Sequence, residues 1–108
     1  MKNKEAIRDR ILKIIYRSII SVNELLPTGN KFLLSIDEKL LGPEGKLDSL
    51  GYINLVTALE REYEDEFGAA ILIGGVEAIE EGSNPFQTVA TLADFIYARY
   101  EAKFRLSE

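Results

Sequence analysis

The sequence predicts an all-α fold, a four-helix bundle with a long first loop and a short third helix. Three segments place apolar residues at steps of three and four, the spacing of an amphipathic helix, and segments with glycine and proline separate them. The 108 residues suit one compact domain, which we expect to span 1–108. Since the chain has no cysteine, no disulfide can stabilise this domain, and helix packing must do so.

The first helix is expected from about residue 3 to residue 26. Its apolar residues form one stripe, which comprises Ile7, Ile11, Ile14, Ile15, Ile19, Val22, Leu25 and Leu26. Lys13, Arg17 and Ser18 interrupt the apolar run, so the segment is too polar for a signal-peptide core or a membrane span. We therefore expect no stable membrane insertion.

A long ordered loop is expected at 27–47, because neither a helical nor a strand period is sustained there. Its apolar residues are too numerous for a disordered tether and are expected to fold back over the helix ends. They are Phe32, Leu33, Leu34, Ile36, Leu40 and Leu41. A short helical turn around 36–40 is one option.

The second helix is expected to begin at Asp48 or Ser49, where Asp48 can cap free backbone N–H groups, and to end at Gly68. Its predicted buried stripe comprises Leu50, Ile53, Val56, Leu59 and Tyr63. Acidic residues crowd its C-terminal half, as either a solvated face or a surface that recognises a basic partner. They are Glu60, Glu62, Glu64, Asp65 and Glu66.

The pattern at 69–84 leaves two interpretations open, since 71–73 fits either an extended segment or a helical extension. Residues 85–87 suggest a single helical turn, and Thr88 is expected to cap a last helix that ends near Lys103. One face of that helix is predicted to comprise Val89, Leu92, Phe95, Ile96 and Tyr100.

The composition excludes several classes of function. With neither cysteine nor histidine, the chain lacks thiol nucleophiles, imidazole bases and the usual zinc ligands, so we do not expect an enzyme. Between residues 48 and 81, Arg61 is the only basic residue and faces nine acids. This balance repels nucleic-acid phosphates and attracts basic protein patches. We therefore expect no nucleic-acid partner.

Ser49 is the candidate site residue. It lies in the sequence Leu-Asp-Ser-Leu at 47–50, where the loop gives way to the second helix. The first turn of a helix presents unpaired N–H groups and the positive end of the helix dipole, which favour a phosphate attached there. A serine at this position can also serve only as a helix-start residue.

From about residue 40 through 95, the chain resembles the acyl carrier proteins. The resemblance rests on the Asp-Ser-Leu motif, the apolar register after the serine, the acidic end of the second helix, and residues 84–89 leading into the last helix. It implies a four-helix bundle of acyl-carrier type and a phosphopantetheine-binding carrier domain over 1–108. Ser49 would carry 4'-phosphopantetheine derived from coenzyme A, whose thiol holds acyl groups as thioesters.

The family's properties imply the partners as well. They are a phosphopantetheinyl transferase, for which Asp48 would help to position a metal ion and coenzyme A, and acyl-loading and acyl-processing enzymes with basic docking patches. The resemblance further implies a monomeric, cytoplasmic protein of lipid metabolism without catalytic activity. Gly51 and Asn54 replace the acids that fatty-acid carriers commonly place after the serine, which favours a dedicated pathway. Fatty acid, polyketide, specialised lipid and lipopolysaccharide pathways all stay open, because no motif in the sequence selects a cargo.

Two alternatives keep the same fold. The first is an aminoacyl or peptidyl carrier, which would use Ser49 in the same way. The second is an unmodified acidic helical module that binds a basic partner through its acidic helix and residues 71–73. A hydrolase with Ser49 as nucleophile ranks lower, since no histidine and no nearby lysine except Lys46 could activate the hydroxyl.

Overall fold

The computed structural model describes residues 2–26, 31–40, 47–73 and 85–106, with the backbone alone at 2–3, 49 and 104–106. The described chain is helical, with α1 at Lys2–Asn23, α2 at Ser49–Phe67 and α4 at Val89–Leu106. Its described parts form no strand beyond an isolated antiparallel bridge between Lys39 and Thr88. None of these helices is long and apolar enough to cross a membrane. The all-α prediction is confirmed for these ranges.

The predicted third helix is not seen in the described residues. Residues 85–87 form a turn and a bend, so the single helical turn suggested there is not confirmed. Residues 74–84, on which much of the prediction for 69–84 falls, lie outside the described ranges. The four-helix arrangement therefore stays a prediction, whereas three helices are established.

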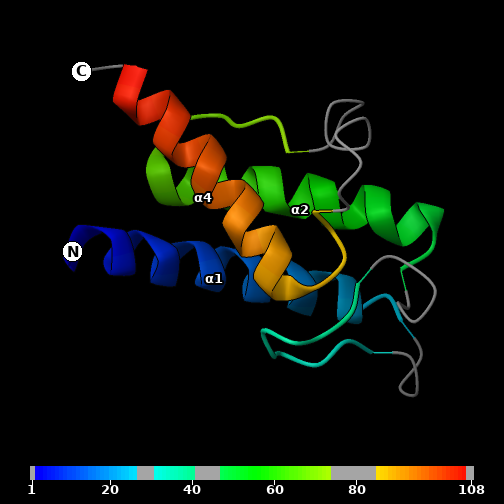
Figure 1. Ribbon diagram of the computed structural model, residues 1–108. Coiled ribbons are helices and arrows are strands. Elements are labelled where there is room, and N and C mark those ends of the chain that lie inside the picture. Colours follow the sequence, from blue (N-terminus) through cyan, green and yellow to red (C-terminus); the bar gives the residue numbers. More distant parts are fainter. Residues whose placement is uncertain (1, 27–30, 41–46, 74–84, 107–108) are drawn as a thin grey trace.

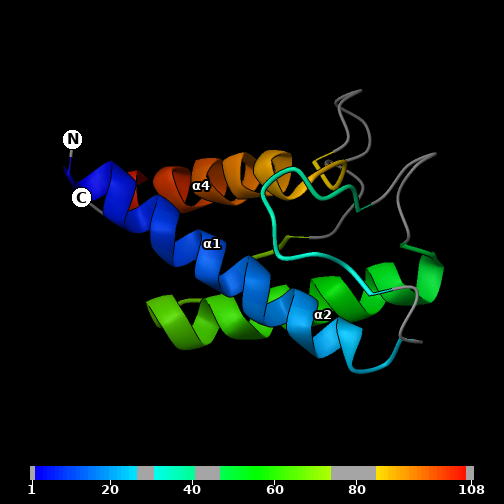
Figure 2. The ribbon, with the colours of Figure 1, turned by 90° about the horizontal axis from the view of Figure 1, so that it is seen from below.

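Helix α1 is the central element of the bundle. It packs against both α2 and α4, whereas no Cα atoms of α2 and α4 lie within 8 Å of each other in the described chain. Figures 1 and 2 show α1 crossing the other two helices, with both chain ends at the same end of the molecule. Side chains and connecting segments must therefore fill the space between α2 and α4.

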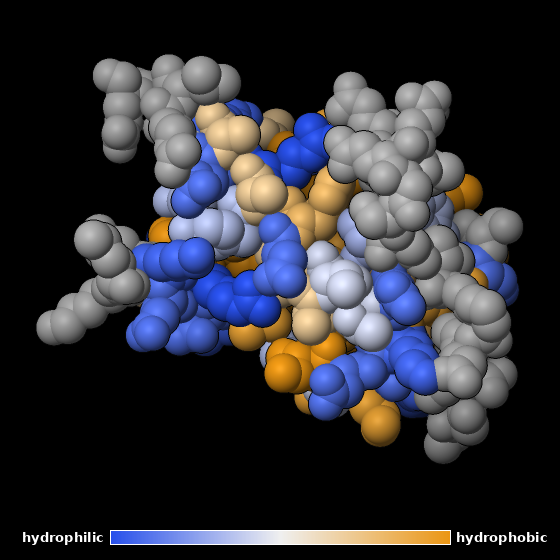
Figure 3. Space-filling view, in the orientation of Figure 1, coloured by the Kyte–Doolittle hydropathy of each residue, from blue (hydrophilic) through white to orange (hydrophobic). Residues whose placement is uncertain are grey.

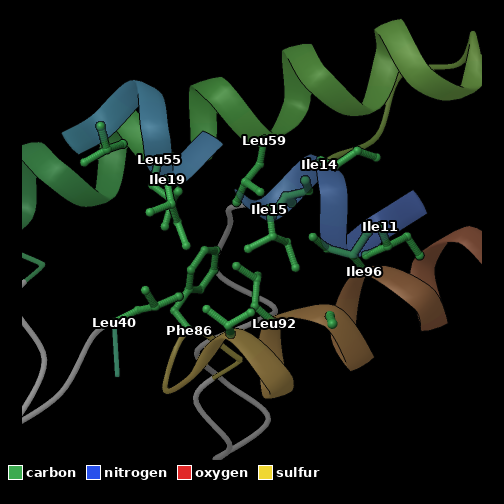
Figure 4. Packing of buried hydrophobic residues seen from close by; sticks show 14 of the residues in the cluster. Ile11, Ile14, Ile15, Ile19, Leu40, Leu55, Leu59, Phe86, Leu92 and Ile96 are labelled. Carbon is green, nitrogen blue, oxygen red and sulfur yellow. The ribbon is translucent and has the colours of Figure 1, made fainter. Parts of the chain in front are cut away.

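The core combines all three helices with residues from the connections. Helix α1 contributes Ile11, Ile14, Ile15, Ile19 and Val22, helix α2 contributes Leu55, Leu59 and Tyr63, and α4 contributes Val89, Leu92, Ala93 and Ile96. From the connections come Phe32, Leu40, Leu47, Ile73 and Phe86. In Figure 4, Phe86 projects from the segment before α4 toward Leu55 and Ile19. The predicted apolar faces of the first and last helices are thus confirmed in their central turns.

The first helix ends three residues before its predicted end. Asn23 is its last residue, and Leu25, predicted to be in the apolar stripe, is 70% exposed beyond it. The Asn23 side chain instead binds the following loop, since its Nδ2 donates to the Phe32 carbonyl (3.0 Å) and its Oδ1 accepts from the Phe32 N–H (2.8 Å). This pair of hydrogen bonds places Phe32 in the core.

The loop at 31–40 is ordered, as predicted, but folds back only in part. Phe32 and Leu40 are buried, whereas Leu33, Leu34 and Ile36 are exposed, and Leu41 lies outside the described residues. A turn closed by the Glu38 N–H on the Ser35 carbonyl (3.1 Å) replaces the helical turn considered for 36–40. The surface in Figure 3 accordingly mixes hydrophobic and hydrophilic side chains.

The same loop caps the last helix. The N–H groups of Val89 and Ala90 donate to the carbonyls of Glu38 (3.1 Å) and Ile36 (2.9 Å). Thr88 caps the helix as predicted, because its Oγ1 accepts from the Thr91 N–H at 3.2 Å. The free N–H groups of the α4 first turn thus bind the loop, which fixes the loop against this helix.

Candidate functional site

Ser49 is the first residue of α2 and follows a well-formed cap. The N-cap residue Asp48 has extended backbone angles, and its carboxylate accepts a hydrogen bond from the Gly51 N–H at 2.7 Å. The Tyr52 N–H donates to the Asp48 carbonyl at 2.8 Å. The predicted cap is therefore confirmed, and the helix start lies at the second of the two predicted residues. The backbone of Ser49 is fixed by these bonds on both sides.

Gly51 lies close to side chains of the two residues that precede Ser49. A Cβ atom at this position would lie 3.0 Å from Asp48 Oδ1 and 3.2 Å from Leu47 Cδ1. Leu47 is itself buried against the core. A side chain at position 51 would therefore require the Asp48 carboxylate or Leu47 to shift by a few tenths of an ångström. Sequence reasoning noted this glycine only as a departure from the carrier family, although a glycine inside a helix is itself a signal of close packing.

Two backbone hydrogen bonds connect the start of α2 to the start of α4. The Leu47 N–H donates to the Leu40 carbonyl (3.0 Å), and the Leu40 N–H donates to the Gln87 carbonyl (2.9 Å). Leu40 is fully buried. The residue before the Asp48 cap is therefore held by the loop and, through it, by the segment that leads into α4.

The predicted buried stripe of α2 is wrong at its N-terminal end. Leu50 is 68% exposed and Ile53 is 58% exposed, whereas Leu55 and Ala58 are buried. Val56 is partly buried, and the predictions for Leu59 and Tyr63 are confirmed. Leu47, which precedes the helix, belongs to the core, whereas Leu50 and Ile53 lie on the exposed side of α2.

Ser49 consequently has apolar neighbours on the surface. Leu50 and Ile53 follow it by one and four residues and are exposed. Tyr52, three residues after Ser49, is partly buried and packs edge-on against Phe86, with ring centroids 5.0 Å apart. The described neighbours of the serine in the first turns of α2 are therefore exposed apolar side chains on one side and the packed Tyr52–Phe86 pair on the other.

Some of the acidic residues at the C-terminal end of α2 bind other parts of the chain, and others are exposed. Glu60 is partly buried and accepts from the Ile73 N–H at 3.0 Å. Glu66 pairs with Arg10, whose Nε lies 2.6 Å from Glu66 Oε2 and whose guanidinium also donates to the Glu66 carbonyl. Glu64 and Asp65 are exposed. Of the two interpretations of these acids, a solvated face does not describe Glu60 and Glu66, which bind Ile73 and Arg10.

Comparison with known proteins gave no match to this chain. No protein-family model matches the chain, and neither the curated proteins nor the solved structures give a match. Among the described residues, no three carboxylate, histidine or cysteine side chains gather into a cluster that could hold a metal ion.

Replacing Gly51 by valine is expected to lower the free energy of unfolding by about 1–3 kcal/mol, the usual cost of overpacking. The new side chain would collide with Leu47 and displace the Asp48 carboxylate from the Gly51 N–H. Urea denaturation measures the effect, with Thr57→Val at an exposed position of α2 as the control. Equal stability of the two variants would mean that the first turn has room for a side chain.

Proposed function

We propose that the protein is an acyl carrier and that Ser49 bears 4'-phosphopantetheine. The observation that carries this proposal is the placement of Ser49 at the first residue of α2, directly after the Asp48 cap and beside exposed Leu50. The cap holds the helix start in one conformation, and the exposed leucine offers apolar contact to a transferase. The side chains that α2 contributes to the core come from residues other than Ser49, so attachment at Ser49 need not disturb the core.

The attachment reaction is a phosphoryl-group transfer. The Ser49 hydroxyl oxygen attacks the phosphorus of coenzyme A that is joined to pantetheine, a new P–O bond forms, and the pyrophosphate bond breaks. Adenosine 3',5'-bisphosphate leaves, and the serine proton passes to a base of the transferase. The N-terminal dipole of α2 favours the resulting phosphodiester anion. When bound, the arm supplies the thiol that the chain lacks, on which an acyl group is held as a thioester.

The surface charge fits protein partners that are basic. Exposed Glu64 and Asp65 lie about four turns from Ser49 on the same helix, and Leu50 and Ile53 are exposed between them. We propose that a phosphopantetheinyl transferase and acyl-loading enzymes bind this helix, with attraction that salt screens. We propose that the protein acts as a monomeric, cytoplasmic carrier in fatty acid, polyketide or specialised lipid synthesis.

Incubation with coenzyme A, magnesium and a promiscuous phosphopantetheinyl transferase tests the proposal. We expect intact-mass spectrometry to show the addition of one phosphopantetheinyl group to the wild-type protein and none to Ser49→Ala. Ser35→Ala is the control, because Ser35 lies in the loop outside the helices and its replacement should leave modification unchanged. An unmodified wild-type protein with several unrelated transferases would remove the proposal.

An unmodified interaction module is the second candidate. The observation that favours it is the exposure of both Leu50 and Ile53, which gives α2 an apolar surface whether or not Ser49 is modified. In that case Leu50→Ala and Ile53→Ala would weaken binding to a basic partner, and the transferase experiment would leave the mass unchanged.

A further inference from the structure

The first three turns of α2 carry no charged side chain. All eleven residues at 49–59 are uncharged, and the first charged residue after Asp48 is Glu60. Glu60 is partly buried, and its carboxylate accepts from the Ile73 N–H at 3.0 Å. This N–H belongs to the segment 71–73, which is not helical and therefore does not extend α2. Arg61 is thus the first exposed charged side chain after Ser49 on this helix.

The exposed side chains of α2 include one strip that begins beside Ser49, which we call the outer strip. Its members follow one another at steps of three or four residues, so they share one face of the helix. They are Leu50, Ile53, Thr57 and Arg61, and all four are exposed. In Figure 2, α1 and α4 lie on one side of α2, and the other side of α2 faces away from both. The outer strip is therefore uncharged until Arg61, about 18 Å along the helix axis from Ser49.

The Arg61 guanidinium has no ion pair and no side-chain hydrogen bond in the part of the chain that the structure describes. Glu64 and Asp65 follow three and four residues later, a spacing at which side chains can meet, yet neither pairs with Arg61 in the described chain. Arg8 and Arg10 of α1, by contrast, bind acids of α4 and α2. The N–H donors of Arg61 thus face solvent, where another protein can bind them.

A guanidinium at the end of the outer strip distinguishes between partner surfaces by their charge. A basic patch laid along the strip brings like charges together at Arg61, which slows association and disfavours that partner. A carboxylate at the same place instead forms a charge-assisted pair with the guanidinium. Leu50 and Ile53 favour an apolar partner surface in either case. The complementary surface is therefore apolar beside Ser49 and acidic opposite Arg61.

We propose that Arg61 is a specificity-determining residue, and that the outer strip binds a partner enzyme whose surface is apolar beside Ser49 and bears a carboxylate opposite Arg61. The inference rests on the proposed attachment at Ser49, and it adds the kind of partner surface that this carrier fits. Basic groups of the partner bind exposed Glu64 and Asp65, one turn beyond Arg61. Enzymes whose basic patch extends over the position of Arg61 are disfavoured.

Loading rates test the repulsion at Arg61. The probe is a promiscuous phosphopantetheinyl transferase with a basic docking patch, and kcat/KM for the carrier is measured at low and high salt. At low salt we expect Arg61→Glu to raise kcat/KM by about three- to tenfold, through a lower KM, with Arg61→Gln in between. The gain should shrink at high salt, because salt screens exposed charges. Arg17→Glu is the matched control, since it makes the same charge change at an exposed residue of α1 and should leave kcat/KM nearly unchanged.

Charge exchange on the enzyme tests the carboxylate opposite Arg61. Each lysine or arginine of the transferase's docking patch is replaced by glutamate in turn. We expect at least one of these enzymes to load the wild-type carrier faster than the parent enzyme does, and to lose this gain with the Arg61→Glu carrier. This double-mutant cycle measures the coupling between the two residues. Ile53→Ser should slow loading by every enzyme, because the apolar contact is lost in each case.

The outcomes separate this inference from the proposed function. Equal kcat/KM values for Arg61→Glu and Arg17→Glu, in proteins that are loaded, overturn the role of Arg61 and leave the carrier function intact. A transferase series in which no glutamate couples to Arg61 overturns the acidic partner surface. An unchanged mass of wild type and all variants with several transferases overturns the carrier function, and the inference with it. Circular dichroism checks that the variants stay folded, which we expect because the replaced side chains are exposed.

Discussion

Replacing Phe86 by alanine is expected to lower the free energy of unfolding by about 3–5 kcal/mol. Phe86 is 2% exposed and lies where residues of all three helices meet. Its ring also packs edge-on against Tyr52, one turn after Ser49, at 5.0 Å and an interplanar angle of 71°. The substitution would remove this contact and leave a cavity that the surrounding helices can fill only in part.

Urea denaturation followed by circular dichroism measures this loss. Gln87→Ala is the matched control, since the neighbouring side chain is exposed and its removal should change stability by about 0.5 kcal/mol or less. A Phe86→Ala protein as stable as Gln87→Ala would show that the segment before α4 does not contribute to the core.

Replacing Leu55 by alanine is expected to destabilise the protein by about 2–5 kcal/mol. Leu55 is 1% exposed on the side of α2 that contributes to the core. Ile53→Ala is the control on the same helix, because Ile53 is 58% exposed and has little packing to lose. Equilibrium unfolding of the two variants measures directly which face of α2 is buried. A larger loss for Ile53→Ala than for Leu55→Ala would restore the register predicted from sequence.

The ends of α2 could be predicted because their causes are local. The Asp48 carboxylate reaches the Gly51 N–H within one turn. Gly68 adopts the left-handed conformation, and its N–H binds the Glu64 carbonyl. Each of these two helix ends depends only on residues a few positions apart in the sequence. The position of Ser49 at the helix start could therefore be predicted from the sequence. The Thr88 cap of α4 was predictable for the same reason.

The register of α2 could not be predicted in the same way. Two stripes on this helix satisfy steps of three and four residues, and periodicity alone does not choose between them. In the structure Leu47, which precedes the helix, is buried in the core and Leu50 is exposed. The close packing at Gly51 depends on the same side chain. Neither the burial of Leu47 nor the close packing at Gly51 can be predicted without knowing the position of the loop that precedes α2.

Contacts between residues far apart in the sequence account for the other differences between the predicted and the observed structure. Glu60 accepts a hydrogen bond from the Ile73 N–H, 13 residues later in the sequence, and Glu66 pairs with Arg10, 56 residues earlier, so both acids have structural roles. The exposure of Leu33, Leu34 and Ile36 follows from the hydrogen bonds of this loop to α4, which fix its backbone against a helix start some fifty residues away. Composition indicated that the loop is ordered, but not which of its side chains are buried.

The most direct test of the central claim is the site of modification after treatment with transferase, coenzyme A and magnesium. Tryptic cleavage after Lys46 and Arg61 releases a peptide that contains Ser49, Tyr52 and Thr57 as its only hydroxyl side chains. We predict that fragmentation of this peptide places one phosphopantetheinyl group on Ser49. An unmodified peptide, or a group located on any other residue, would contradict the account.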